Sequence, residues 1–396
     1  MPDQEKKILT EGGAAEQINV SEQKSTGELV SAVRRPRMHY HGRVTQVLIY
    51  LGKFLRMFIY QNDWKVLPMA ALIAGMVSVV IRRSMFMNME GTLKGALALS
   101  CLAIWNGCFN SVQVVCRERG IIKREHRSGM HISSYVFAHM VYQALLCLMQ
   151  TVLTIYVCSV MKVRFPEEGL FTPWFKADLG ITIFLITYAA DMMSLWISSL
   201  VHTAAAAMTL MPFILILQLT FSGGVFSLPG RLQGLSTLTI SNWGLKCVAS
   251  QAGYNDLPMM TAWNMLSGME KEEVEVTMKL GNIFRFVVDH LEMDQPEEQP
   301  LAEDPTVKYL LEDPGLEDIR EEPVTVKTTV GEIIDAAGKE KTKETVIQKT
   351  SAANRSPVYD NTFDNILSCW GNLFLFAIAF AALSVLTLEF IDKDRR

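Results

Sequence analysis

The sequence lacks the motifs that most enzymes need. Its nearest approach to a phosphate-binding loop, Gly223 to Arg231 (GGVFSLPGR), has neither the required spacing nor the Lys-Ser/Thr pair that holds phosphate and magnesium. There is no HExxH motif and no Ser/His/Asp pattern, and the seven histidines are scattered without metal-ligand spacing. We therefore assign no catalytic residue, no metal ligand and no bound cofactor, and we expect that this chain cannot hydrolyse ATP alone.

Cysteine is also scarce, and no CxxC spacing occurs. Five of the seven cysteines fall in or at the ends of long apolar runs, and only Cys247 and Cys369 could meet on the outer side. Two cysteines do not define a disulfide framework. The polar N-terminus has no apolar signal-peptide core, so we expect the first membrane span to serve as the insertion signal.

Long apolar runs are the dominant positive feature. They approach the roughly 20 helical residues that cross a bilayer, and in lipid every backbone polar group must be paired within the segment, which favours helices. We expect an all-α membrane protein with six transmembrane helices. The expected spans are Val66 to Ile81, Gly95 to Cys116, Ser133 to Met161, Ala177 to Val201, Thr203 to Phe226 and Ile366 to Phe390.

Charge is distributed unevenly along the chain. Residues 227–365 hold 13 Lys and Arg against 24 Asp and Glu, whereas the whole chain has a net charge of only −4. The segments Arg34 to Arg56, Arg117 to Arg127 and Lys393 to Arg396 are basic. The positive-inside rule then places both termini in the cytoplasm of a multi-pass protein of the plasma (inner) membrane, although Arg82 and Arg83 oppose it. The acidic segment would lie outside.

The expected domains follow from these patterns. Residues 1–35 are rich in Gly, Ser, Glu and Gln, and we expect a disordered tail. Residues 36–64 carry apolar side chains at three- and four-residue steps, which predicts an amphipathic helix lying in the membrane interface; a soluble helix packed on a domain is the alternative. Residues 65–226 would hold spans one to five, and residues 366–396 span six and the cytoplasmic C-terminus.

Residues 227–365 are expected to form a large extracytoplasmic insert with a small acidic domain. Within it, Ser227 to Pro258 has helical spacing and is expected to dip back toward the membrane. Lys271 to Met293 predicts an amphipathic helix, and Pro296 to Pro323 an acidic, proline-rich linker. Val324 to Val346 alternates at first and then changes period, which indicates a short strand followed by a helix.

A charged segment lies between the second and third spans. We interpret residues 117–131 as a cytoplasmic helix on which a partner can push. Its candidate coupling residues are Arg117, Glu118, Arg119, Lys123, Arg124 and Glu125.

Polar and aromatic residues also lie inside the predicted spans, where such groups either join helices or line a path. Span two contains Asn106, Phe109, Asn110 and Gln113, and span five contains Phe221 near its end. Asp191 lies near the middle of span four, where a carboxylate normally faces the protein interior or a wet cavity. It is either a proton or cation site or an interhelical hydrogen-bonding group, with Ser194 or Tyr188 among the possible partners.

The order of these elements resembles the membrane domain of type-2 ABC exporters, specifically the G (White) type. The segments that carry the resemblance are REHRSGMHISSY (124–135), ISSLVHTAAAAMTLMP (197–212) and FSGGVFSLP (221–229). The resemblance implies that Asn106 and Phe109 contact substrate, and it places Ile216 and Leu219 among the span-five contacts. Phe109 would be a stacking surface at a dimer axis or would simply pack within the bundle.

The resemblance also implies partners. G-type proteins usually carry an ATPase upstream on the same chain, whereas here only about 40 residues precede the amphipathic segment. We therefore expect either a separate ATPase that binds ATP and Mg, or that this chain is a fragment of a longer gene product. We also expect a half-transporter that works as a homo- or heterodimer in a lipid bilayer, without nucleic acid. The expected function is export of a hydrophobic or amphipathic molecule. The alternatives are a membrane-anchored receptor or scaffold acting through the acidic insert, and an intramembrane enzyme that uses Asp191.

Overall fold

The structure is a computed structural model, and it describes residues 42–60, 63–224, 233–279 and 312–390, with Gly281, Asn282, Arg285 and Lys308. The chain divides into two units, Met1–Gln46 and Val47–Arg396, and the first is described only from Gly42. Several expectations lie wholly or partly outside the described residues: the tail at 1–35, the start of the amphipathic helix at 36–41, the end of span five at 225–226, most of the predicted helix after residue 279, most of the linker at Pro296 to Pro323 and the basic terminus at 393–396.

Six apolar helices lie where the sequence predicts spans. They are α3 (Val66–Ile81), α4 (Met89–Ser111), α6 (Ile132–Val160), α7 (Phe175–Leu200), α8 (Ala204–Thr220) and α17 (Phe363–Glu389). In the described part of the chain, four helices are long and apolar enough to cross a membrane: α6, α7, α17, and α4 taken together with α5 (Val114–Arg127). α3 and α8 are shorter apolar helices. The helical membrane fold is thus confirmed, and the crossing of α3 and α8 stays a prediction.

Local sequence signals fix several helix ends. Asn88 caps α4, because its side chain accepts a hydrogen bond from the Gly91 N–H at 2.7 Å. Thr203 caps α8 in the same way, accepting from the Ala206 N–H at 3.2 Å. Gly129, with φ of 103°, ends the turn that separates α5 from α6. The charged helix therefore ends at Arg127, a few residues before the predicted end at 131.

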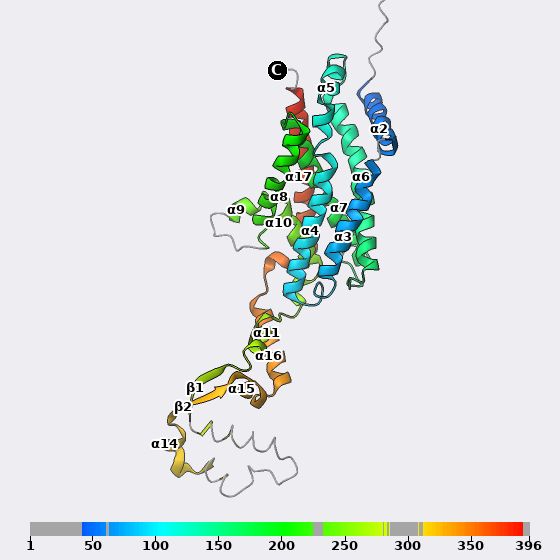
Figure 1. Cartoon of the computed structure of the whole chain (residues 1–396). Coiled ribbons are helices and arrows are strands. Elements are labelled where there is room, and N and C mark those ends of the chain that lie inside the picture. Colours follow the sequence, from blue (N-terminus) through cyan, green and yellow to red (C-terminus); the bar gives the residue numbers. More distant parts are fainter. Residues whose placement is uncertain are drawn as a thin grey trace, which may run out of the picture. The chain divides into compact units, whose positions relative to one another are not determined.

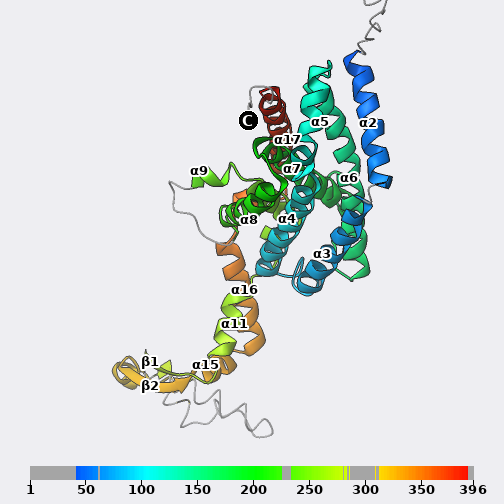
Figure 2. The ribbon, with the colours of Figure 1, turned by 45° about the horizontal axis from the view of Figure 1, so that its top comes forward.

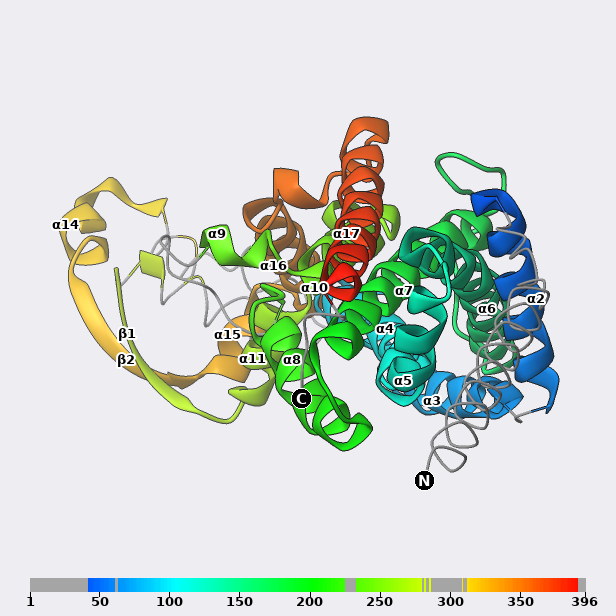
Figure 3. The same ribbon diagram turned by 90° about the horizontal axis from the view of Figure 1, so that it is seen from above.

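Helix α7 is the centre of the bundle. It packs most extensively against α4 and α17, and also against α6 (Figures 1 and 3). Leu99 of α4, Ile186 of α7 and Leu373 of α17 are among the large side chains that this packing buries. At the α4–α7 contact, Gly107 lies so close to the α7 backbone that an added Cβ would be 2.1 Å from the Thr187 carbonyl oxygen. Small residues permit such close approach between membrane helices.

The expected N-terminal amphipathic helix is present as α2 (Arg43–Tyr60), and it lies beside α6 (Figures 2 and 3). Phe54 is buried and contacts Tyr135 and Tyr142 of α6, with ring centroids 5.6 and 5.8 Å apart. Leu48 and Ile59 are exposed. One side of α2 thus packs on protein while other apolar side chains stay uncovered, as an interfacial helix requires.

The described insert begins with two helices, α9 (Gln233–Ser236) and α10 (Ile240–Gln251). α10 packs against α4, α7 and α17 and is buried along most of its length, so the helical spacing predicted for this segment is confirmed. Cys247 of α10 and Cys369 of α17 lie in one buried cluster. The two cysteines that could meet are thus near each other, and both are free thiols.

The insert contains a strand where the sequence predicts a helix. Residues Glu273–Lys279 form β1, which pairs antiparallel with β2 (Pro323–Thr329), Val276 opposite Val326. The helix expected over Lys271 to Met293 is therefore wrong in its described first part. Val274 and Met278 are four residues apart, but they also alternate with charged and polar residues, and this period of two is typical of a strand.

The second half of the insert follows the prediction. β2 leads into α15 (Val330–Ala336) through a capping box at Thr329 and Glu332, and α16 (Lys339–Ala353) follows. Short helical turns complete the described insert: η2 (Tyr254–Asp256), α11 (Thr261–Gly268), η4 (Pro314–Leu316), α14 (Glu317–Arg320) and η5 (Pro357–Tyr359).

The outer part of the insert, residues 261–349, begins and ends at neighbouring points. The Met259 N–H donates to the Ser351 hydroxyl at 2.7 Å, and the Asn255 amide donates to the Ser356 carbonyl at 2.8 Å. An ion pair of 2.8 Å joins Arg355 to Asp256.

Candidate functional site

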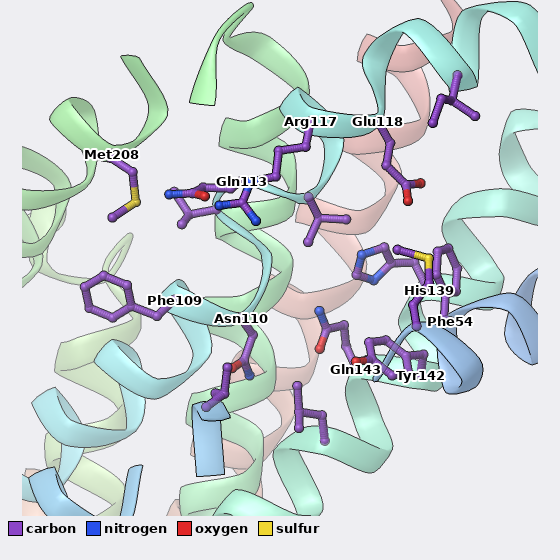
Figure 4. A pocket seen from close by; sticks show the side chains of 16 residues that line it. Phe54, Phe109, Asn110, Gln113, Arg117, Glu118, His139, Tyr142, Gln143 and Met208 are labelled. Carbon is purple, nitrogen blue, oxygen red and sulfur yellow. The ribbon is translucent and has the colours of Figure 1, made fainter. Parts of the chain in front are cut away.

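A cavity of about 470 Å³ lies between α2, α4, α5 and α6, with α8 at one side (Figure 4). Three of the residues predicted to line a path are in its wall: Phe109, Asn110 and Gln113. Two of the predicted coupling residues, Arg117 and Glu118, are in the same wall. The structure therefore brings three of the seven predicted path residues and two of the six predicted coupling residues to one place.

The apolar part of the wall is contributed by several helices. Phe109 of α4 and Met208 of α8 face one side of the cavity, and Phe54 of α2 and Tyr142 of α6 face the other (Figure 4). Phe109 also contacts Trp105 with ring centroids 5.5 Å apart, and both rings remain partly exposed. Such a wall suits an apolar ligand, because aromatic side chains supply large contact areas at small entropic cost.

Amide groups form the polar part of the wall. Asn110 and Gln150 exchange two hydrogen bonds of 2.9 Å between α4 and α6. Gln143 donates from Nε2 to the Ser111 hydroxyl at 2.8 Å. The polar side chains of span two thus have a structural role in joining α4 to α6, as interhelical hydrogen bonds do in membranes.

His139 and Gln143 line this cavity, and the sequence analysis did not single them out. Both are 1% exposed, and among the described residues the His139 Nδ1 and the Gln143 Oε1 have no hydrogen-bond partner. The sequence did contain a signal: a histidine and a glutamine one helical turn apart within an apolar span, where polar side chains face the protein interior.

The remaining predicted path residues lie elsewhere. Asn106 is buried and does not line the cavity. On α8, Ile216 is 61% and Leu219 40% exposed, so they lie on an uncovered face, and Phe221 is the residue at which α8 ends. Within one chain, the predicted path residues of α8 therefore lie apart from the cavity, and a path enclosed by two copies stays a prediction.

Asp191 is fully buried in α7. Its Oδ2 accepts a long hydrogen bond from the Cys147 thiol at 3.8 Å, which joins α7 to α6. Neither suggested partner contacts this carboxyl group: Ser194 bonds to the backbone carbonyl of Asp191, and the Tyr188 hydroxyl bonds to the carbonyl of Met140. The Oδ1 of Asp191 is buried without a hydrogen-bond partner among the described residues, and both interpretations of Asp191 stay predictions.

The charged helix α5 is attached to its neighbours. Glu118 accepts hydrogen bonds from Lys53 of α2 and from Tyr135 of α6, both at 3.3 Å. Glu125 accepts from the Tyr50 hydroxyl at 2.9 Å. Burial, and next the adjoining Glu125 carboxylate, raise the pKa of the Tyr50 phenol. Tyr50 therefore stays a neutral donor, and the two carboxylates of α5 hold α2 in place.

The basic residues of α5 differ in their contacts and in their exposure to solvent. Arg119 donates to the carbonyls of Ser199 and Val201 at 3.0 and 3.2 Å, and so it caps the C-terminal end of α7. Lys123 is half-buried. Arg117 and Arg124 are exposed.

Comparisons with known proteins agree with this architecture. The family model described as "ABC-2 type transporter" matches residues 46–246, which run from α2 through α8 and into α10. The chain is also similar to the ABC transporter ATP-binding/permease protein Rv1747 of Mycobacterium tuberculosis (strain ATCC 25618 / H37Rv), 26% identical over 153 residues, which are 37% of this chain and 17% of that protein. Because the family model covers half of its length, the chain belongs to the ABC-2 type transporter family and contains its membrane domain.

Proposed function

We propose that this chain is the permease subunit of an ABC-2 type exporter that moves a hydrophobic or amphipathic molecule out of the cytoplasm or the inner leaflet. ATP hydrolysis on a partner nucleotide-binding subunit, with its Mg, would drive the movement. One observation carries the proposal: Arg117 and Glu118 belong to the charged helix α5 and at the same time to the wall of the cavity. A force on α5 therefore acts directly on the cavity.

The proposed ATPase partner would contact the exposed side of α5. Arg124 and Arg127 are exposed at its end, whereas Glu118, Arg119 and Glu125 hold α5 to α2, α6 and α7. A helix attached to three others moves with them rather than bending alone. This arrangement fits a part that transmits a conformational change from a partner.

A second copy, or a related permease, would complete the transporter. Six large apolar side chains of α8 are exposed: Met208, Leu210, Phe213, Ile216, Leu217 and Leu219. Together with Phe109 of α4, they offer an apolar surface to lipid or to a second membrane domain. We propose that both termini are cytoplasmic and that the chain is a multi-pass protein of the plasma (inner) membrane.

Transport by inside-out membrane vesicles tests the proposal. Vesicles from the native host that produces the chain are expected to accumulate a hydrophobic fluorescent dye when ATP and Mg are added. The variant Arg124→Glu, which reverses an exposed charge of α5, should lower the rate by about fivefold or more because it weakens coupling to the ATPase. Arg83→Glu, an exposed charge just beyond the end of α3, is the matched control and should not change the rate.

Two results would contradict the proposal. One is the absence of ATP-dependent accumulation in vesicles that contain the folded chain. The other is an equal rate in Arg124→Glu, Arg83→Glu and the unmodified chain, since a coupling surface must respond to a reversed charge.

A further inference from the structure

Two residues of the cavity wall each have a buried polar atom that lacks a hydrogen-bond partner in the described part of the chain. The side chains of His139 and Gln143 lie one helical turn apart on α6, where Figure 4 shows both on the wall of the cavity. Each is 1% exposed, and the His139 Nδ1 and the Gln143 Oε1 have no hydrogen-bond partner among the described residues. Buried polar atoms are nearly always hydrogen-bonded, because an unpaired one costs free energy. Two of them side by side on a cavity wall point to a ligand.

The hydrogen bond to Ser111 determines which hydrogen-bonding group this ligand must carry. Gln143 donates from Nε2 to the Ser111 hydroxyl at 2.8 Å, so the other end of its amide, the acceptor Oε1, is the atom without a partner among the described residues. A molecule that satisfies Oε1 must bring an N–H or O–H donor. His139 can pair with the same head group through Nδ1, since an imidazole nitrogen accepts or donates according to its tautomer.

The rest of the cavity is suited to an apolar body. Phe109, Val112, Leu146 and Met208 line it together with Phe54. Its volume of about 470 Å³ is within the range of roughly 300–1,000 Å³ that is typical of small-molecule sites. The carboxylate in its wall, Glu118, is already paired with Lys53, so the cavity offers no free acidic group to a cationic head.

We propose that this cavity within a single chain binds an amphiphile with an apolar body and a head group that donates a hydrogen bond, either a hydroxyl or an amide N–H. Gln143 accepts that hydrogen bond, and His139 pairs with a second polar atom of the same head. The proposal rests on the proposed function, since it names the class of molecule that the transporter takes up. It adds α6 to the helices that select the cargo.

Photolabelling of the purified full chain in lipid nanodiscs tests the site without ATP. The probes are a twelve-carbon alcohol that carries a diazirine and the methyl ether of the same alcohol, which lacks the donor. We expect the alcohol to label peptides of α4, α5 and α6 that line the cavity, at about five times the yield of the ether or more. Mass spectrometry of the digested protein locates and quantifies the label.

Variants on α6 separate the polar contacts from the shape of the cavity. Gln143→Met keeps the volume but removes the acceptor, so it should reduce alcohol labelling to the level of the ether. Leu146→Trp fills the cavity and should reduce both probes. The control is Thr151→Val on the same helix: Thr151 bonds to the Cys147 carbonyl of its own helix and lies outside the cavity, so both yields should be unchanged.

The site and the transport function can fail separately. Equal labelling by alcohol and ether in the unmodified chain, or label located outside the cavity, would overturn the site even if vesicles transport the dye. If Gln143→Met does not fold, the site is still tested by the ratio of the two labelling yields in the unmodified chain and by the effect of Leu146→Trp. Selective labelling of the cavity in a chain that supports no ATP-driven transport would uphold the site and remove the proposed function.

Discussion

Replacing Gly107 by alanine should separate the two central helices of the bundle. The added Cβ would lie 2.1 Å from the Thr187 carbonyl oxygen, 2.9 Å from the Asp191 nitrogen and 3.0 Å from the Ala190 Cβ. Two of these three atoms belong to the α7 backbone, so a side-chain rotation cannot relieve the contact. Carbon and carbonyl oxygen atoms in helix interfaces lie roughly 3.3–3.6 Å apart, so α4 and α7 would have to separate locally by about 1.2 Å.

This separation lowers the packing free energy between α4 and α7. A radial gap of about 0.5–1 Å already forfeits a quarter to a half of the dispersion energy of each contact pair, and overpacked cores lose about 1–3 kcal/mol. Alanine gains about 0.8–1 kcal/mol over glycine in helix propensity, which offsets part of the loss. Because the obstacle is backbone in the most extensive helix contact of the described bundle, we expect a net loss of about 2 kcal/mol.

Thermal unfolding of the purified chain in detergent, followed by tryptophan fluorescence, measures this effect. Gly371→Ala in α17 is the matched control, since nothing lies within 4 Å of the added Cβ, and it should be neutral or slightly stabilising. Gly75→Ala, whose Cβ would be 3.9 Å from Val157 Cγ1, should behave in the same way. If Gly107→Ala were as stable as these two controls, α4 and α7 would not approach each other as closely as the structure shows.

Three further predictions concern the attachments of α5 and the insert. Glu118→Lys should lower stability by about 1 kcal/mol because it breaks the half-buried ion pair with Lys53, and the double exchange with Lys53→Glu should restore most of it in the same unfolding assay. Arg119→Ala should lower the free energy of unfolding by about 1–2 kcal/mol, because two carbonyls at the end of α7 lose their hydrogen-bond donor. Amide hydrogen exchange should become faster at that end of α7 and nowhere else. Replacing residues 261–349 by a short Gly-Ser linker should preserve ATP-dependent transport, because hydrogen bonds already join the two points at which the chain enters and leaves the insert; a receptor or scaffold would lose its function instead.

Much of the fold could be predicted from the sequence, because the length of an apolar run indicates a helix that can cross a membrane. The predicted first span, Val66 to Ile81, has the bounds of α3, and the predicted third and fourth spans differ from α6 and α7 by one or two residues. Strand β1 was missed because a segment of seven residues is too short for the periods of helix and strand to be distinguished when valine, glutamate and methionine satisfy both.

The site was predicted only in part, because a cavity is a property of packing. Phe109, Asn110 and Gln113 were found since they are polar or aromatic residues in one span, but Asn106, three residues before Phe109, turned out to be buried away from the cavity. His139 and Gln143 face the cavity only because α6 packs between α2 and α4, and nothing in the sequence of α6 states which helices will be its neighbours.

The same packing explains how a charged helix can act on an apolar cavity. Arg117 and Glu118 are adjacent in sequence and line the cavity, while the next residue, Arg119, holds the end of α7. In the proposed cycle, a displacement of α5 by the ATPase therefore changes the cavity wall and the end of the central helix in one step. A movement confined to α5 would have to break the Glu118, Arg119 and Glu125 contacts together. Since those contacts join α5 to three helices, a rigid-body movement of the group costs less free energy than a local one.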